Sequence, residues 1–373
     1  MSIYADAKKF AEEFIVPYSK ESDEKAQFPK ESFKKMGEHG YFKLLIPVER
    51  GGQGKNIRDH LDICMAFAES CPSVGLCYMM HNVALSNVLA YGKLALVDKV
   101  VKDVIENNKV LALANSEFGT GTHFYKSEVT VKQDGDKTTF NGTKSMVTTA
   151  EYASYYATLT PSPAGGLNNW LFPLDTPGLS FQMGKWDGLG MRGNVSCPMK
   201  LENATLDSSY QLGDEDSGME QTFKVVAPLF VLGLAGVYTG ICLEQFRVAK
   251  DYSISRVYPD GKALSHIETV QIHLGNIYNR AFASQAMARE AARAALDGEP
   301  DVLEKILSAR IFASESAIEC SRLAMRIGGG KAYNRHTSIE RFLRDAYAGQ
   351  IMAPSVDVLA IWLGKTVTGL PLI

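Results

Sequence analysis

The sequence lacks the cysteine and charge patterns of several functional classes. None of its six cysteines forms a Cys-x-x-Cys pair, which argues against a zinc site or a thioredoxin-like centre and favours a reduced intracellular setting. The 39 basic and 42 acidic residues give a net charge of −3, without the positive excess typical of nucleic-acid-binding proteins. The N-terminus contains no apolar signal core. We therefore expect a cytoplasmic protein with no nucleic-acid partner.

Short catalytic motifs are also missing. No two of the seven histidines have the i,i+4 spacing of a zinc-binding helix, and there is no aspartate-rich calcium loop, so we expect no metal site. The chain has neither a P-loop nor the Gly-x-Ser-x-Gly turn of serine hydrolases. Residues 119–121 read Gly-Thr-Gly and lack the third glycine of a dinucleotide-binding fingerprint, which argues against a Rossmann domain.

Charged residues are absent from residues 225–243, a run of 19 residues that is about long enough to span a bilayer. Gly236 and Gly240 lie four residues apart within it, a spacing typical of closely packed helices. The run continues at helical spacing into Glu244 and Arg247. We interpret it as part of one long helix buried in a helical core, with no membrane span.

Three regions of different periodicity follow one another along the chain. Up to about residue 112, apolar residues such as Leu61 and Met65 recur at helical spacing. The next hundred residues alternate apolar with polar positions, and the Asp-Gly pair at 134–135 predicts a hairpin. From about residue 213 the periodicity is helical again, and the three glycines at 328–330 predict a helix end. This order predicts a β domain between two helical ones.

A loop rich in glycine and hydroxyl groups follows an apolar, strand-like run at the start of the β region. Residues 116–122 read Ser-Glu-Phe-Gly-Thr-Gly-Thr. Glycines allow a ligand to approach the backbone, and hydroxyls can donate to phosphate or carbonyl oxygens. By itself the same pattern also fits a plain surface turn.

Taken together, several short segments resemble the acyl-CoA dehydrogenase family. Each is weak alone, but they occur in the family's order over nearly the whole chain: residues 28–54 as its helix-to-loop signature, 116–122 as its flavin loop, 141–148 as its Asn-Gly-x-Lys strand, 190–192 as its Gly-x-Arg segment, 256–262 as its Arg-x-x-Phe-Gly-Lys turn, and 327–329 and 344–346 as its last two blocks. The resemblance implies an α+β fold with an N-terminal helical domain (1–112), a middle β-barrel domain (113–212) and a C-terminal four-helix bundle (213–373).

The resemblance also implies a bound FAD and an acyl-CoA substrate. The residues that would contact the flavin or its ribityl chain are Ser116, Gly121, Thr122, Met146 and Thr148. Arg256, Gly328 and Gly329 would approach the same FAD from a neighbouring subunit, so a homotetramer or homodimer follows by analogy. The electron acceptor would be an electron-transfer flavoprotein. The acyl group would lie against Thr122, Phe230, Tyr347, Ala348 and Gly349.

The sequence departs from the family at the catalytic base. Family dehydrogenases remove an α-proton with a glutamate, and we align its two alternative positions with Ala348 and Phe230, neither of which can accept a proton. Tyr347 and His123 are weak candidates for a relocated base; the usual pKa of tyrosine, near 10, disfavours the first.

Chemistry without α-proton abstraction is the alternative to a relocated base. We therefore expect an FAD-dependent oxidoreductase with non-standard catalysis. Its alternatives on the same fold are a flavin-dependent monooxygenase, a desulfinase-like enzyme that cleaves a β-substituent, and a catalytically silent subunit of a heteromeric dehydrogenase.

Overall fold

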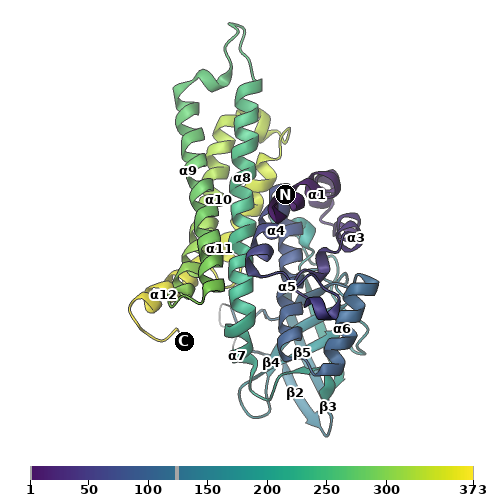
Figure 1. Ribbon diagram of the computed structural model, residues 1–373. Helices are drawn as coiled ribbons and strands as arrows, with labels where there is room; N and C mark the ends of the chain where they lie inside the picture. Colours follow the sequence, from purple (N-terminus) through teal and green to yellow (C-terminus); the bar gives the residue numbers. More distant parts are fainter. Residues whose placement is uncertain (1, 122–125, 373) are drawn as a thin grey trace.

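The computed structural model describes residues 2–121 and 126–372, and its first region is helical (Figure 1). The helices are α1 (Ile3–Phe14), α2 (Val16–Lys25), α3 (Lys30–Glu38), α4 (Ile57–Ser70), α5 (Pro72–Tyr91) and α6 (Leu94–Asn107). Local sequence sets their ends. The Asn56 side chain accepts hydrogen bonds from the backbone N–H groups of Arg58 and Asp59 at the start of α4. The Asp59 carboxylate in turn accepts a hydrogen bond from the backbone N–H of Asn56.

The middle region consists of two four-stranded sheets that share one apolar core. The strands are β1 (Leu111–Leu113), β2 (Thr130–Asp134), β3 (Lys137–Val147), β4 (Tyr155–Pro161), β5 (Leu167–Pro173), β6 (Leu179–Phe181), β7 (Cys197–Asp207) and β8 (Gln211–Leu212). Their order is β1-β4-β5-β8 in one sheet and β2-β3-β7-β6 in the other. Phe140 of one sheet packs its ring against Trp170 and Phe172 of the other. The hairpin predicted at residues 134–135 is confirmed, because Asp134 pairs with Lys137 across the turn.

The C-terminal region is a bundle of long helices. It contains α7 (Gly218–Gln221), a π-helical turn (Thr222–Val226), α8 (Ala227–Ser255), α9 (Glu268–Asp297), α10 (Val302–Tyr333), α11 (Ile339–Ile351) and α12 (Val356–Val367). Figure 1 shows α8, α9 and α10 side by side, with the connection from α8 to α9 at the end farthest from the strands. The fold is therefore α+β with two helical domains around a β domain, as the sequence predicts.

Helix α8 contains the apolar run and is packed within the protein. By length and composition, the helical stretch from Gly218 to Ser255 could cross a membrane, but 72% of its most apolar window is buried inside the protein. Its glycines face α4: a Cβ on Gly240 would lie 2.5 Å from the Met65 carbonyl oxygen, and one on Gly236 would lie 2.9 Å from Leu61 Cδ1. The close approach of α8 and α4 requires these glycines, as expected for a buried core helix.

The helix end predicted at the glycine run is confirmed, and one boundary differs in detail. Gly329 (φ 52°, ψ −141°) is not helical, so the range Val302–Tyr333 given for α10 contains two helices that meet at a kink. Glycine adopts this positive φ readily because it has no Cβ. Strand β1 crosses the expected domain boundary at residue 112, because it pairs with β4 as part of a sheet.

Candidate active site

A cavity of about 670 Å³ lies where the β domain meets the C-terminal helices. The residues that line it come mainly from five places: the loop after β1, the end of β3, the loop between β6 and β7 (Trp186 to Ser196), the segment before α8 together with the start of α8, and the end of α11 with the loop into α12. Most of these side chains are apolar, and the polar groups are mainly serine and threonine hydroxyls and the side-chain amides of Asn115, Asn194 and Gln350. An apolar hollow with a few polar groups on one side is the usual form of a small-molecule site.

The loop after β1 is anchored by a buried ion pair. The Lys144 ammonium bonds to the Glu117 carboxylate, and neither side chain is more than 1% exposed. Lys144 also donates to the Leu159 carbonyl oxygen at 2.6 Å, and the backbone N–H of Glu128 donates to Glu117 at 2.5 Å. Burial lowers the pKa of Lys144, while the neighbouring carboxylate raises it. Glu117 is therefore engaged in holding the loop, although it lines the cavity.

Four of the residues predicted to contact a flavin line this cavity: Ser116, Gly121, Met146 and Thr148. The backbone N–H of Ser145 donates to the Ser116 carbonyl at 2.7 Å, which ties the loop to β3. Thr148 Oγ1 lies 3.1 Å from Ser196 Oγ, so two hydroxyls meet at the cavity wall. Thr122 and His123, also predicted here, lie outside the described residues.

The donor set and the open space of this wall fit a flavin. Gly121 has a φ of +54°, and a Cβ built on it would meet no atom of residues 2–121 and 126–372 within 4 Å. Met146 is 56% exposed at the cavity, although it follows a buried strand segment. Hydroxyls and a free loop backbone can donate to the carbonyl and ribityl oxygens of a flavin, while Met146 offers an apolar contact to its ring.

The opposite wall contains three of the five predicted substrate residues; Gly349 does not face the cavity, and Thr122 lies outside the described residues. Phe230, Tyr347 and Ala348 line the cavity, whereas Gly349 is buried on the other face of α11 against the Tyr238 ring. A Cβ on Gly349 would lie 2.8 Å from that ring. Because successive helix positions are about 100° apart, adjacent residues of α11 face different neighbours.

Sequence reasoning missed the loop between α11 and α12. Met352, Ala353 and Pro354 line the cavity, as does Trp362 of α12. The signals that could have found this loop are the proline at 354 and the helix-capping residue Ser355, which accepts from the Val358 backbone N–H. Alanine occupies the centre of this loop too, so the loop supplies no acidic group.

No unpaired carboxylate lines the cavity within residues 2–121 and 126–372. The charged lining residues are Glu117, which is bound to Lys144, and Arg344. The Arg344 guanidinium is held by Asp23 at 2.6 Å and by Glu340 at 2.9 Å. In the described part of the site, then, neither an aspartate nor a glutamate is placed to remove a substrate proton.

The remaining predicted flavin contacts lie far from this cavity within one chain. Arg256 is exposed and follows the last residue of α8, whereas Phe230 lies in the first turn of the same helix. At 1.5 Å per residue, the two are about 39 Å apart along the helix. Gly328 and Gly329 belong to the distal part of α10. One chain does not bring these residues together with Ser116 and Thr148.

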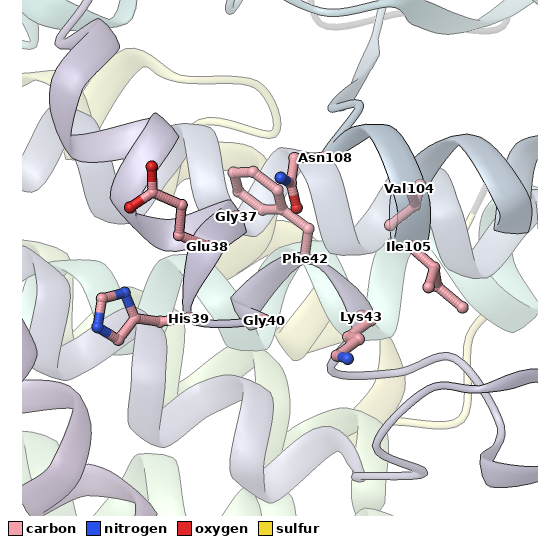
Figure 2. Close-up of a pocket in the computed structure, with 9 residues that line it drawn as sticks. All are labelled: Gly37, Glu38, His39, Gly40, Phe42, Lys43, Val104, Ile105 and Asn108. Atoms are coloured by element: carbon pink, nitrogen blue, oxygen red, sulfur yellow. The ribbon is translucent and has the colours of Figure 1, made fainter.

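A second, shallower pocket of about 380 Å³ lies in the N-terminal domain. It is lined by α3 and the following turn on one side and by Val104, Ile105 and Asn108 on the other. Figure 2 shows the His39 ring and the Lys43 side chain well apart from each other, so they do not converge on one point. This pocket therefore lacks the clustered groups of an active site.

Comparisons with known proteins agree with the fold. Family models match three consecutive parts of the chain: the acyl-CoA dehydrogenase N-terminal domain at residues 2–108, the middle domain at 112–204 and the C-terminal domain at 232–367. The solved structure of butyryl-CoA dehydrogenase from Megasphaera elsdenii has a TM-score of 0.91 and 22% identity, and the match covers 99% of this chain and 98% of that one.

Two curated relatives show similarity over nearly their full length. A 3-(aryl)acrylate reductase from Clostridium sporogenes is 28% identical over 96% of this chain and 93% of its own length. The mitochondrial short-chain specific acyl-CoA dehydrogenase of Homo sapiens is also 28% identical, over 94% of this chain and 85% of its own. Since all three domain models match in order and together cover most of the sequence, this chain belongs to the acyl-CoA dehydrogenase family of flavin-dependent oxidoreductases.

Proposed function

We propose that the protein binds FAD in the large cavity and transfers hydride between the β-carbon of an acyl-CoA, or a similar acyl thioester, and the cofactor. The observation that supports this most is the arrangement of one cavity between a hydroxyl-bearing loop and an apolar helix wall. FAD would supply the two-electron redox chemistry. Ser116, Met146 and Thr148 would hold its ring system, while Phe230 and Ala348 would exclude water from the acyl group.

The complete cofactor site would need a second copy of the chain. Arg256, Gly328 and Gly329 lie at the distal end of the bundle, so they can meet FAD only if a neighbouring subunit presents them. A guanidinium suits the paired phosphates of the cofactor, and glycines without a Cβ allow its close approach. This supports a homodimer or homotetramer as the active form.

The carboxylate-free wall supports non-standard catalysis. An apolar wall suits reactions in which the protein does not have to remove an α-proton, such as reduction of a conjugated double bond, β-substituent cleavage or oxygenation. In the reduction, the β-carbon would accept the hydride and the α-carbon would take its proton from solvent water. The relative named a 3-(aryl)acrylate reductase makes the reduction the leading case. Aromatic residues on the cavity, among them Trp186, Phe223 and Trp362, are compatible with an aryl group on the substrate.

The test is the visible spectrum of the FAD-loaded protein under anaerobic conditions. Saturated and unsaturated acyl-CoAs, with alkyl or aryl β-substituents, are added to the oxidised protein and to the dithionite-reduced protein. Bleaching of the oxidised flavin by a saturated thioester, or reoxidation of the reduced flavin by an unsaturated one, is the expected result. If no thioester changes either spectrum, this function is wrong, and oxygen uptake or a heteromeric partner becomes the next question.

A further inference from the structure

A fully buried arginine lies behind the substrate wall. Arg310 of α10 has no exposed surface, and no aspartate or glutamate of the described chain lies within ion-pair distance of it. Its Nη2 donates to the Gly349 carbonyl oxygen at 3.1 Å, and its guanidinium lies 4.6 Å from the centre of the Tyr238 ring. Nε and Nη1 have no hydrogen-bond partner in residues 2–121 and 126–372.

The contact of Arg310 is with the end of a helix. Gly349 lies in the last turn of α11, where backbone carbonyl groups have no partner within the helix. The end of a helix also has partial negative charge, which favours a nearby cation. Burial lowers the pKa of Arg310 to about 10, so the guanidinium stays positively charged at neutral pH. The guanidinium therefore supplies a hydrogen-bond donor to the Gly349 carbonyl oxygen and a positive charge next to the partial negative charge at the end of α11.

The same turn of α11 forms the cavity wall on its other side. Tyr347, Ala348 and Ile351 line the cavity, whereas Gly349 between them packs against Tyr238. A side chain at position 349 would collide with that ring, so α11 and α8 are in direct contact there. Arg310, Tyr238 and Gly349 thus join α10, α8 and α11 at one point directly behind the wall.

We propose that Arg310 is a positioning residue that sets the place of the α11 wall, and with it the loop at 352–354, against the substrate. This role rests on the proposed function of the cavity. Other contacts hold the rest of α11, such as the bond from the Met191 backbone N–H to Asp345, but the Arg310 bond holds its last turn. When the Arg310 bond is lost, the Gly349 carbonyl group has to be satisfied by water or by unwinding of the turn, and the wall shifts. Small displacements of a substrate-positioning wall reduce turnover strongly.

The first experiment measures the local stability of the α11 wall and does not depend on enzyme activity. Hydrogen–deuterium exchange of peptides covering residues 345–356 is compared in the wild type, Arg310→Met and Arg322→Met. Arg322 is a control from the same helix, since it is exposed and paired with Glu319. We expect exchange in this segment to rise roughly tenfold in Arg310→Met and to be unchanged in Arg322→Met.

The second experiment measures kcat and KM with the thioester that changes the flavin spectrum. Arg310→Met should lower kcat/KM by roughly tenfold or more, with the flavin content unchanged. Arg310→Lys should recover part of the loss, because lysine keeps the charge but cannot stack on Tyr238. A folded Arg310→Met protein whose exchange and kinetics match the wild type would overturn the proposal.

Two further outcomes are decisive. If Arg310→Met does not fold, Arg310→Gln takes its place, because glutamine removes the charge, and wild-type exchange together with wild-type kinetics in that variant overturns the proposal. If no thioester affects the flavin of the wild type, the proposed function fails, whereas the exchange comparison still decides whether Arg310 holds the end of α11.

Discussion

At the scale of single residues, the most informative feature is Ala348, an alanine where a proton acceptor is expected. A second alanine, Ala353 in the loop after α11, lines the same cavity. Replacing each by glutamate should place a carboxylate against the acyl group and raise the rate at which a saturated acyl-CoA bleaches the flavin. General base catalysis typically contributes about 10²- to 10⁴-fold, so even an imperfectly placed carboxylate should be measurable.

Matched glutamine variants separate the effect of the added carboxylate from the effect of the larger side chain. Ala348→Gln and Ala353→Gln should show no gain, because an amide does not accept a proton at neutral pH. If both glutamate variants fold, contain FAD and bleach no faster than the wild type, an ordinary saturated acyl-CoA is the wrong substrate class.

A buried carboxyl in α11 makes the stability depend on pH. Asp345 is fully buried, and burial raises its pKa from 3.8 to about 6, while its Oδ1 accepts from the Met191 backbone N–H at 2.5 Å. The folded state therefore binds this proton more tightly than the unfolded state. Stability from this group should fall as the pH rises from about 4 through 6, by about 3 kcal/mol at most.

The variant Asp345→Asn keeps a hydrogen-bond acceptor for Met191 but cannot ionise. It should lack this fall, and should therefore be more stable than the wild type at pH 7.5 and close to it at pH 4.5. Urea denaturation of the FAD-loaded proteins across this range provides the measurement. Identical pH dependence in the two proteins would show that Asp345 does not cause it.

At the scale of elements, the glycines of α8 determine how closely the two helical domains approach. A methyl group at Gly240 would lie 2.5 Å from the Met65 carbonyl oxygen of α4, which is backbone and cannot move aside as a side chain can. Gly240→Ala should therefore destabilise the protein by about 1–3 kcal/mol. Denaturant midpoints measure the change.

Gly275 of α9 is the control for this prediction. It is exposed, and a Cβ there would meet nothing within 4 Å. Gly275→Ala should stabilise the protein by about 0.5–1 kcal/mol, because alanine favours a helix interior. If both substitutions raised the midpoint, helix propensity and not close packing would dominate at Gly240.

At the scale of the whole molecule, the residues predicted to contact FAD lie at two ends of the structure. Ser116 and Thr148 lie at the β domain, whereas Arg256 lies at the distal end of α8. If a neighbouring subunit completes the site, Arg256→Ala should weaken FAD binding by roughly tenfold while leaving the fold intact, since a charge-assisted bond to phosphate is lost.

Oligomer size is measured on the same samples. Light scattering should show a dimer or tetramer for both the wild type and Arg256→Ala, and FAD titration of each gives the dissociation constant. A monomeric wild type that retains FAD with full occupancy would show that one chain is sufficient and that Arg256 has no part in the site.

Much of the architecture could be predicted from the sequence because it depends on local patterns. The helical and β regions, the hairpin at Asp134 and the burial of α8 follow from periodicity, turn residues and an uncharged run. The resemblance to acyl-CoA dehydrogenases, which the family models confirm, likewise needed only the order of short segments. The roles of the individual site residues stay predictions.

Only the tertiary structure decided which residues share a wall. Helical periodicity gives the angle between Ala348 and Gly349 but not which of them faces the cavity, because that depends on where α8 and α10 lie. The loop at 352–354 and the burial of Arg310 are likewise products of packing between distant segments. The sequence by itself determined the elements and the family, and long-range packing determined the surfaces on which any chemistry depends.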